Sequence, residues 1–455
     1  MEATHFTGRH GRDAHGPFSF MNPTIRRSRI RLNKADHQSS QEDLRSKDKG
    51  SQDAHGTQAH PAKGRNEIWI GDVERLFRTR DNRKGRHQIS ISSIQDQNAQ
   101  FLTPKPSNTI RAVFRGVLRI FTAFPYWDIS YLVALIFTIG SVDWVVNAFF
   151  VWLPLQVPST EFKGEIANAG GISAFVGATI FEIGSVLLMI EAVNENRAKC
   201  FGWAIEEVLG DTGLRRLRPV GCVHHHVNRK NLVGKGKGVD GELSLDMEMA
   251  PKTDLNSNSK AKPSRTWTWW PTWYELKSHY FKEVGFLACL SQMIGATIFW
   301  ISGFTALPPI YSRLTSTAAQ NGAYWLPQVL GGTGFIVSGF LFMVETQQKW
   351  YLPAPKVLGW HIGLWNLIGG IGFTLCGALG FAASNSGCVY QGSLATFWGS
   401  WCFLVGSIIQ LYESLDKQPV NVEDGGGRIS DIVKSVYIKK SDSFFKLSYA
   451  NLSWC

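Results

Sequence analysis

The chain has 455 residues, of which 44% are hydrophobic and 18% charged, and its formal net charge is +11. Its mean hydropathy of −0.08 is that of a soluble protein, yet the apolar residues are concentrated in six runs. The sequence contains no nucleophile elbow, His-Glu-x-x-His helix, phosphate-binding loop or dinucleotide fingerprint. We therefore expect a protein that is not an enzyme and that has no cofactor.

The first 110 residues are rich in His, Gln, Ser, Asp, Arg and Lys and have few apolar clusters. Such a composition buries too little apolar surface to offset the entropy of the chain, so we expect residues 1–110 to form a disordered, basic tail. The first twenty residues have no apolar run typical of a secretory signal. The first membrane helix is then expected to direct insertion.

Six apolar runs follow, and each is long enough to cross a bilayer, which needs about 20 residues of helix. Soluble helices of this length would need a polar face, and these runs have none. The sequence therefore predicts an all-α membrane protein with six transmembrane helices. The runs cover residues 129–155, 171–193, 284–307, 325–344, 357–383 and 394–412.

The six runs form three pairs that resemble one another. In the second run of each pair a Gly precedes a Glu by fourteen residues, as in Gly177 and Glu191, Gly331 and Glu345, and Gly399 and Glu413. The first runs align on Gly140, Gly295 and Gly369. We interpret the chain as three parallel copies of a two-helix hairpin, because each copy has an even number of spans. The hairpins cover residues 111–193, 283–344 and 357–412, and a disordered tail at 413–455 follows them.

The basic residues predict the orientation. Of the 47 Lys and Arg residues, only Lys163 and Arg313 lie on the side opposite the termini. Basic residues remain cytosolic during insertion, so we expect both termini in the cytosol, at the plasma membrane or an endomembrane. The positive charge favours anionic inner-leaflet lipids over nucleic acid as a partner, although it also serves to set the topology.

Two acids lie within the apolar runs of the first hairpin. Asp143 and Glu182 have similar expected depths, and a charge at the middle of a span costs about 2.5–3.5 kcal/mol. We expect a polar site in the membrane, formed by these acids with Asn147, Gln292 and Asn366. The alternative is that the acids are protonated and hydrogen-bonded structural groups.

The three repeat-end acids, Glu191, Glu345 and Glu413, lie at helix C-termini, where the helix dipole disfavours negative charge. Pairing with bases that follow in the sequence would offset this effect. The expected partners are Arg197, Lys349 and Lys417. We interpret the acids mainly as structural, with a shared cytosolic site as the alternative.

The loop at residues 194–282 contains two further features. Cys222, His224 and His226 are metal-ligand types, but adjacent histidines do not all face one ion, so we treat them as solvated residues and only weak metal candidates. The Trp-rich segment before the third span predicts an interfacial helix at residues 273–282.

Five short blocks of sequence, which begin at Trp127, Phe181, Tyr324, Pro355 and Phe397, together resemble a family of fungal integral membrane proteins over about residues 110 to 420. The resemblance implies a multi-pass membrane protein and no particular activity. The pattern Gly-x-x-Ile-Phe-x-Ile-Gly-Ser also resembles the small two-helix YrhK-like bacterial proteins.

Two functions fit these features. The first is a non-catalytic membrane organiser or sensor whose cytosolic tails bind protein partners. The second is a transporter or channel for a small cation or a proton-coupled solute, using the acids of the first hairpin. The long tails and small outer loops favour the first.

Overall fold

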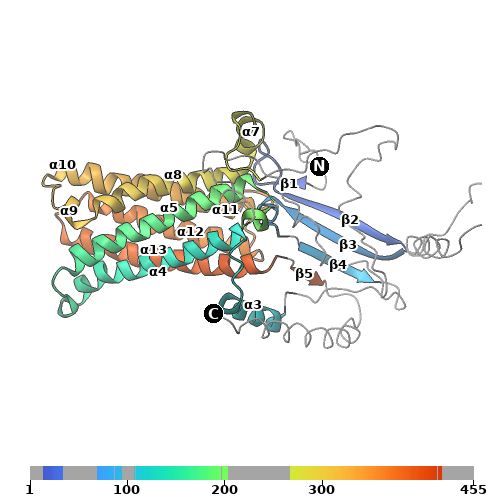
Figure 1. Ribbon diagram of the computed structural model, residues 1–455, viewed down its shortest axis with the longest axis horizontal. Coiled ribbons are helices and arrows are strands. Elements are labelled where there is room, and N and C mark those ends of the chain that lie inside the picture. Colours follow the sequence, from blue (N-terminus) through green and yellow to red (C-terminus); the bar gives the residue numbers. More distant parts are fainter. Residues whose placement is uncertain are drawn as a thin grey trace, which may run out of the picture.

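The computed structural model describes residues 14–33, 69–86, 88–94, 107, 109–195, 197–202, 267–417 and 419–422 (Figure 1). Six of its helices are long and apolar enough to cross a membrane, with mean hydropathies of 1.4 to 1.9. This confirms the predicted six-span membrane protein. The helices are α4 (Ile129–Gln156), α5 (Gly171–Val193), α8 (Val284–Thr305), α11 (Leu326–Glu345), α12 (Leu358–Gly380) and α13 (Ser386–Leu415).

The six helices form a closed ring. Each helix packs against the next in the sequence, and α13 packs against α4. Glycines allow the closest approaches: a Cβ atom on Gly295 of α8 would lie 2.8 Å from the carbonyl oxygen of Gly331 on α11. Small residues of this kind let helix backbones pack tightly in a membrane, where dispersion rather than hydrophobic burial drives association.

Two layers of aromatic rings fill the axis of the ring. In the first, the ring centroid of Trp144 lies 5.6 Å from that of Phe299 and 4.9 Å from that of Phe373. In the second, Phe181 lies 6.3 Å from Phe335 and 5.6 Å from Phe403. All six side chains are at most 4% exposed. The axis is therefore a packed core at these two levels.

The two ends of the bundle differ (Figure 1). At the loop end lie short elements: η1 (Pro158–Thr160), η2 (Glu165–Gly170), α9 (Pro308–Tyr311), α10 (Thr317–Gln320) and η5 (Asn321–Trp325). At the other end, here called the sheet end, α5, α11 and α13 finish and a β-sheet extends away from the helices.

The sheet has five strands in the order β1-β2-β3-β4-β5. The first four are antiparallel neighbours, and β5 pairs in parallel with β4. This differs from our expectation of disorder at 1–110 and 413–455, because parts of both tails pair with each other here; their remainder lies outside the described residues. The strands are β1 (Ala14–His15), β2 (Ile25–Asn33), β3 (Trp69–Arg78), β4 (Gln88–Ile94) and β5 (Val420–Val422).

Short helices surround the sheet end. In α3 (Ile110–Thr122), exposed apolar residues recur at helical spacing: Ile110, Val113, Phe114, Val117, Leu118 and Phe121. The segment expected as one interfacial helix at 273–282 is instead α7 (Trp273–Ser278) followed by η4 (Tyr280–Lys282).

Not all of the Trp-rich segment faces outward. Trp270 and Trp273 are 78% and 64% exposed, but Trp267 is fully buried. Trp267 packs in a core with Phe201, which follows η3 (Ala198–Cys200), and with the ends of α4 and α5. The side chain of Asn194 fixes this segment by bonding to both the N–H and the carbonyl of Thr268.

Candidate functional site: an ion-pair cap on the helix bundle

A β-hairpin inserts its tip into the sheet end of the bundle. Strands β3 and β4 are joined by the short helix α2 (Thr79–Arg83) and a turn at Lys84 and Gly85. Gly85 has φ of +63°, a left-handed conformation that most residues avoid, and it lets the chain reverse into β4. The tip carries four basic residues that are at most 7% exposed, Arg80, Arg83, Lys84 and Arg86.

Two of the repeat-end acids bind arginines from this tip. Arg83 donates two hydrogen bonds to the carboxylate of Glu345, at 2.9 and 2.8 Å. Arg80 donates two to Glu413, at 2.5 and 2.6 Å. Thr79 also donates to Glu345, at 2.9 Å. Bidentate pairs of this kind are both strong and geometrically specific.

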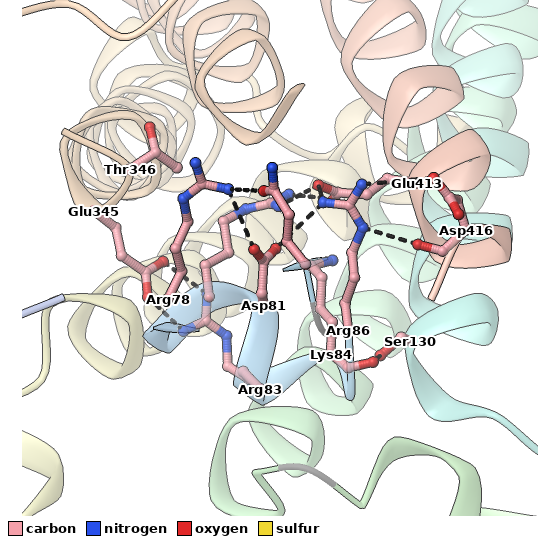
Figure 2. A network of polar contacts seen from close by, with 12 residues as sticks. Arg78, Asp81, Arg83, Lys84, Arg86, Ser130, Glu345, Thr346, Glu413 and Asp416 are labelled. Atoms are coloured by element: carbon pink, nitrogen blue, oxygen red, sulfur yellow. Dashed lines mark hydrogen bonds and ion pairs between the residues drawn. The ribbon is translucent and has the colours of Figure 1, made fainter. Parts of the chain in front are cut away.

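Arg86 extends the Glu413 side of the cluster. Its guanidinium lies 3.5 Å from Glu413 and 3.4 Å from Asp81, and its Nε donates to the backbone carbonyl of Asp416 at 2.8 Å (Figure 2). Arg86 therefore ties the hairpin tip to the end of α13.

The third acid, Glu191, has different partners. Ser130, near the start of α4, donates a hydrogen bond to it, and the Lys84 ammonium attracts it electrostatically. Lys417 reinforces this side, because its Nζ donates to the carbonyl of Lys84 at 2.7 Å and pairs with Asp128 at 3.1 Å. We call the four basic tip residues, Asp81 and the three repeat-end acids the ion-pair cap.

Small residues at the starts of the odd spans make room for the cap. A Cβ atom on Gly359 would lie 2.7 Å from Nη1 of Arg80, and one on Gly285 would collide with Arg83 and Glu345. Gly285 and Gly359 each precede the aligned glycine of their hairpin by ten residues, as Ser130 does in the first hairpin. In each of the three predicted hairpins a small residue, Gly or Ser, therefore lies beside the cap at this position.

The charges of the cap balance. Four bases, Arg80, Arg83, Lys84 and Arg86, face four acids, Asp81, Glu191, Glu345 and Glu413. Burial alone would lower the pKa of Arg83, but Glu345 outweighs it and the pKa lies well above the usual range. Burial also lowers the pKa of Lys84, and there Glu191 opposes the effect only in part. Removing one partner from such a buried set leaves an uncompensated charge.

Below the cap lies a small cavity of about 40 Å³. Arg80, Arg83, Lys84 and Glu191 of the cap line it, and Phe181 and Phe403 of the second aromatic layer line it as well. Apart from these cap residues, its polar lining is neutral and can hydrogen-bond. These residues are Ser141, Gln292, Asn366, Ser407 and Gln410. The volume suits two or three water molecules.

The residues predicted for a polar site in the membrane fall in four places. Gln292 and Asn366 both line the cavity. Asp143 lies against Gly177, between α4 and α5, whereas Glu182 accepts a hydrogen bond of 2.9 Å from Thr297 of α8. Asn147 binds the carbonyl of Gly170 at the loop end. The two acids thus occupy separate helix interfaces, and neither lines the cavity.

The partners expected for Glu345 and Glu413 were wrong. Lys349 lies over the ring of Tyr351, and Lys417 binds Asp128, while Glu345 and Glu413 take arginines from the tip. Sequence reasoning missed Arg80, Arg83 and Lys84 because they lie in a segment interpreted as disordered. The sequence did contain a signal: Arg83 and Lys84 follow Arg80 by three and four residues, which places them on the same helical face, and Gly85 comes next. The weak metal candidates Cys222, His224 and His226 lie outside the described residues.

Comparison with protein-family models, with curated proteins and with solved structures finds no match for this chain.

Proposed function

We propose that this protein is a non-catalytic membrane organiser or sensor, in which a closed six-helix bundle anchors a β-sheet at the membrane surface. The observation that carries the proposal is the filled axis. Six buried aromatic rings occupy it in two layers, and the ion-pair cap covers the cavity above them. A bundle of this kind is suited to holding the sheet in place, where cytosolic protein partners would bind.

Triplication of a hairpin is part of this proposal. Phe181, Phe335 and Phe403 each follow the aligned Gly of their run by four residues, and together they form one aromatic layer. The other layer follows the same rule from Gly140, Gly295 and Gly369. The three repeat-end acids also converge on one hairpin tip. These correspondences support three copies in parallel orientation.

We further propose that the sheet end faces the cytosol and anionic lipids. The distribution of Lys and Arg supports this orientation. Helix α3 supports it independently, because Arg111, Arg115 and Arg119 recur beside its exposed apolar stripe. A helix with this pattern lies in the lipid headgroup region.

The alternative is a transporter or channel. The cavity with its amide and hydroxyl lining is the observation that favours it. Against it, Asp143 and Glu182, the acids expected to carry a cation, lie apart from each other and away from that cavity. We therefore rank the organiser first.

Flux through proteoliposomes separates the two functions. Vesicles containing the purified full chain should show H⁺, Na⁺ and K⁺ fluxes equal to those of empty vesicles, with gramicidin as the positive control. A photo-crosslinking residue at Phe77, which is exposed on β3, should give discrete protein adducts in cells, and the same residue at Phe162 of the loop end should not. A saturable ion flux without Phe77 adducts would overturn the proposal.

A further inference from the structure

Three side chains with metal-ligand chemistry meet at the sheet end, outside the ion-pair cap. Glu195 follows α5, His279 lies between α7 and η4, and Glu283 is the N-cap residue of α8. The Nε2 atom of His279 lies 3.4 Å from Oε1 of Glu283 and 3.9 Å from Oε1 of Glu195. One ligand atom from each residue lies within 4.8 Å of the others.

The two separations from His279 are close to those of a tetrahedral site. Zinc binds His nitrogen at about 2.0–2.1 Å and carboxylate oxygen at about 2.0–2.2 Å, so neighbouring ligand atoms lie about 3.3–3.6 Å apart. The observed 3.4 Å already matches, and the 3.9 Å separation requires only a small rotation of a side chain. One His and two carboxylates leave the fourth position for water, as in many zinc sites.

The surroundings hold the ligands in place. The Nδ2 atom of Asn82, in α2, donates a hydrogen bond of 2.9 Å to Oε2 of Glu195, so the other oxygen of this carboxylate faces His279. Bonds of this kind orient metal ligands. The side chains are between 12% and 30% exposed, so a hydrated ion has access to them.

The charges also favour a cation or a shared proton at this place. The carboxylates of Glu195 and Glu283 lie within reach of the same imidazole, and two carboxylates this close repel each other unless a proton or a cation lies between them. Imidazole with carboxylate oxygen suits zinc and similar transition-metal ions better than calcium or magnesium.

We propose that Glu195, His279 and Glu283 bind a divalent transition-metal ion of the zinc class. Bound there, the ion joins the end of α5 to the start of α8 and, through Asn82, to the hairpin tip. This proposal does not depend on the organiser function, and it does not use Cys222, His224 or His226. It is a structural clip that fixes the sheet to the bundle.

The test uses the full chain in detergent, stripped with a chelator and titrated with Zn²⁺, Mn²⁺ or Mg²⁺. Zn²⁺ should raise the Tm of the wild type, and Mg²⁺ should not. His279→Ala should lose one equivalent of bound Zn²⁺ together with this rise in Tm. Asn82→Ala should keep the equivalent but weaken its binding by about 10–100-fold.

Control variants make the outcome decisive. His361→Ala removes another histidine at the sheet end, whose Nε2 contacts the carbonyl of Pro355, and should keep wild-type stoichiometry. Glu283→Gln keeps the shape of the N-cap residue and should behave as His279→Ala does. If both His279→Ala and Glu283→Gln retain full Zn²⁺ stoichiometry and the rise in Tm, the three residues form only a His–carboxylate contact and the proposal is overturned.

Discussion

Neutralising Glu413 should destabilise the protein more than its single changed atom suggests. Glu413 is 1% exposed, accepts two hydrogen bonds from Arg80 at 2.5 and 2.6 Å, and lies 3.5 Å from Arg86. Glu413→Gln keeps the shape of the side chain and removes its charge. Four cap bases then face three acids in a buried site.

The expected loss of stability follows from the cost of breaking a buried ion pair, about 3–5 kcal/mol. At roughly 2–4 °C per kcal/mol for a domain of 150–250 residues, the Tm should fall by roughly 6–20 °C. The tryptophan fluorescence of the purified protein reports this unfolding. Lys349→Met is the matched control, because it removes an exposed charge that lies over Tyr351 and should change stability by less than about 0.5 kcal/mol.

A double variant tests the electrostatic reasoning itself. Arg80→Met combined with Glu413→Met removes both members of the pair, while Arg86 keeps Asp81 and Asp416. Replacing a buried pair by apolar residues is often neutral, so the double variant should recover most of the stability lost in Glu413→Gln. The reasoning is refuted if Glu413→Gln melts within about 1 °C of the wild type or if the double variant is worse than the single one.

Three other outcomes are expected. Gly359→Ala should cost about 1–3 kcal/mol because its Cβ meets Arg80, whereas Gly322→Ala, with nothing within 4 Å, should leave the Tm unchanged; equal effects would contradict the close packing. Asp143→Asn with Glu182→Gln should keep stability within about 1 kcal/mol and leave all fluxes unchanged, and a changed flux would instead favour the transporter. Burial lowers the pKa of the Lys84 ammonium below its ordinary 10.5 in the folded protein. Between the folded pKa and 10.5 the unfolded chain therefore holds more protons than the folded one, so the stability should rise as the pH increases through this window. Lys84→Met should lack this rise in Tm between pH 7 and 10.5, and identical slopes in both proteins would refute the assignment.

The membrane spans were predictable from the sequence. Of the ion-pair cap, the repeat-end acids were predictable and their basic partners were not. Twenty apolar residues force a helix in lipid because the backbone has no other hydrogen-bond partner, so each span is a local property. The repeat-end acids were found by aligning the spans. Their basic partners come from more than 100 residues away in the sequence, and the pairing of Arg80 with Glu413 depends on tertiary contacts that no local pattern contains.

The expected polar site in the membrane shows a second limit of sequence reasoning. Asp143 and Glu182 have similar depths, but depth along a helix says nothing about which face a residue occupies. Asp143 lies against α5 and Glu182 contacts α8, so the two acids lie in different helix interfaces. Gln292 and Asn366 point to the common cavity because each precedes its aligned glycine by three residues, on the inner face of its helix.

The proposed triplication of the hairpin raises the question of how an asymmetric hairpin tip docks in one orientation. Three equivalent acids offer three rotations, and the first hairpin differs from the others at one adjoining position. Ser130 stands where Gly285 and Gly359 leave space for a guanidinium, and its hydroxyl already binds Glu191. An arginine directed at Glu191 would meet that hydroxyl, whereas the slimmer lysine at position 84 fits beside it. Arg86 with Asp416 and Asn82 with Glu195 add contacts available in one rotation only. The contact of Ser130 with Glu191 therefore distinguishes the first hairpin from the other two, together with the contacts of Arg86 with Asp416 and of Asn82 with Glu195.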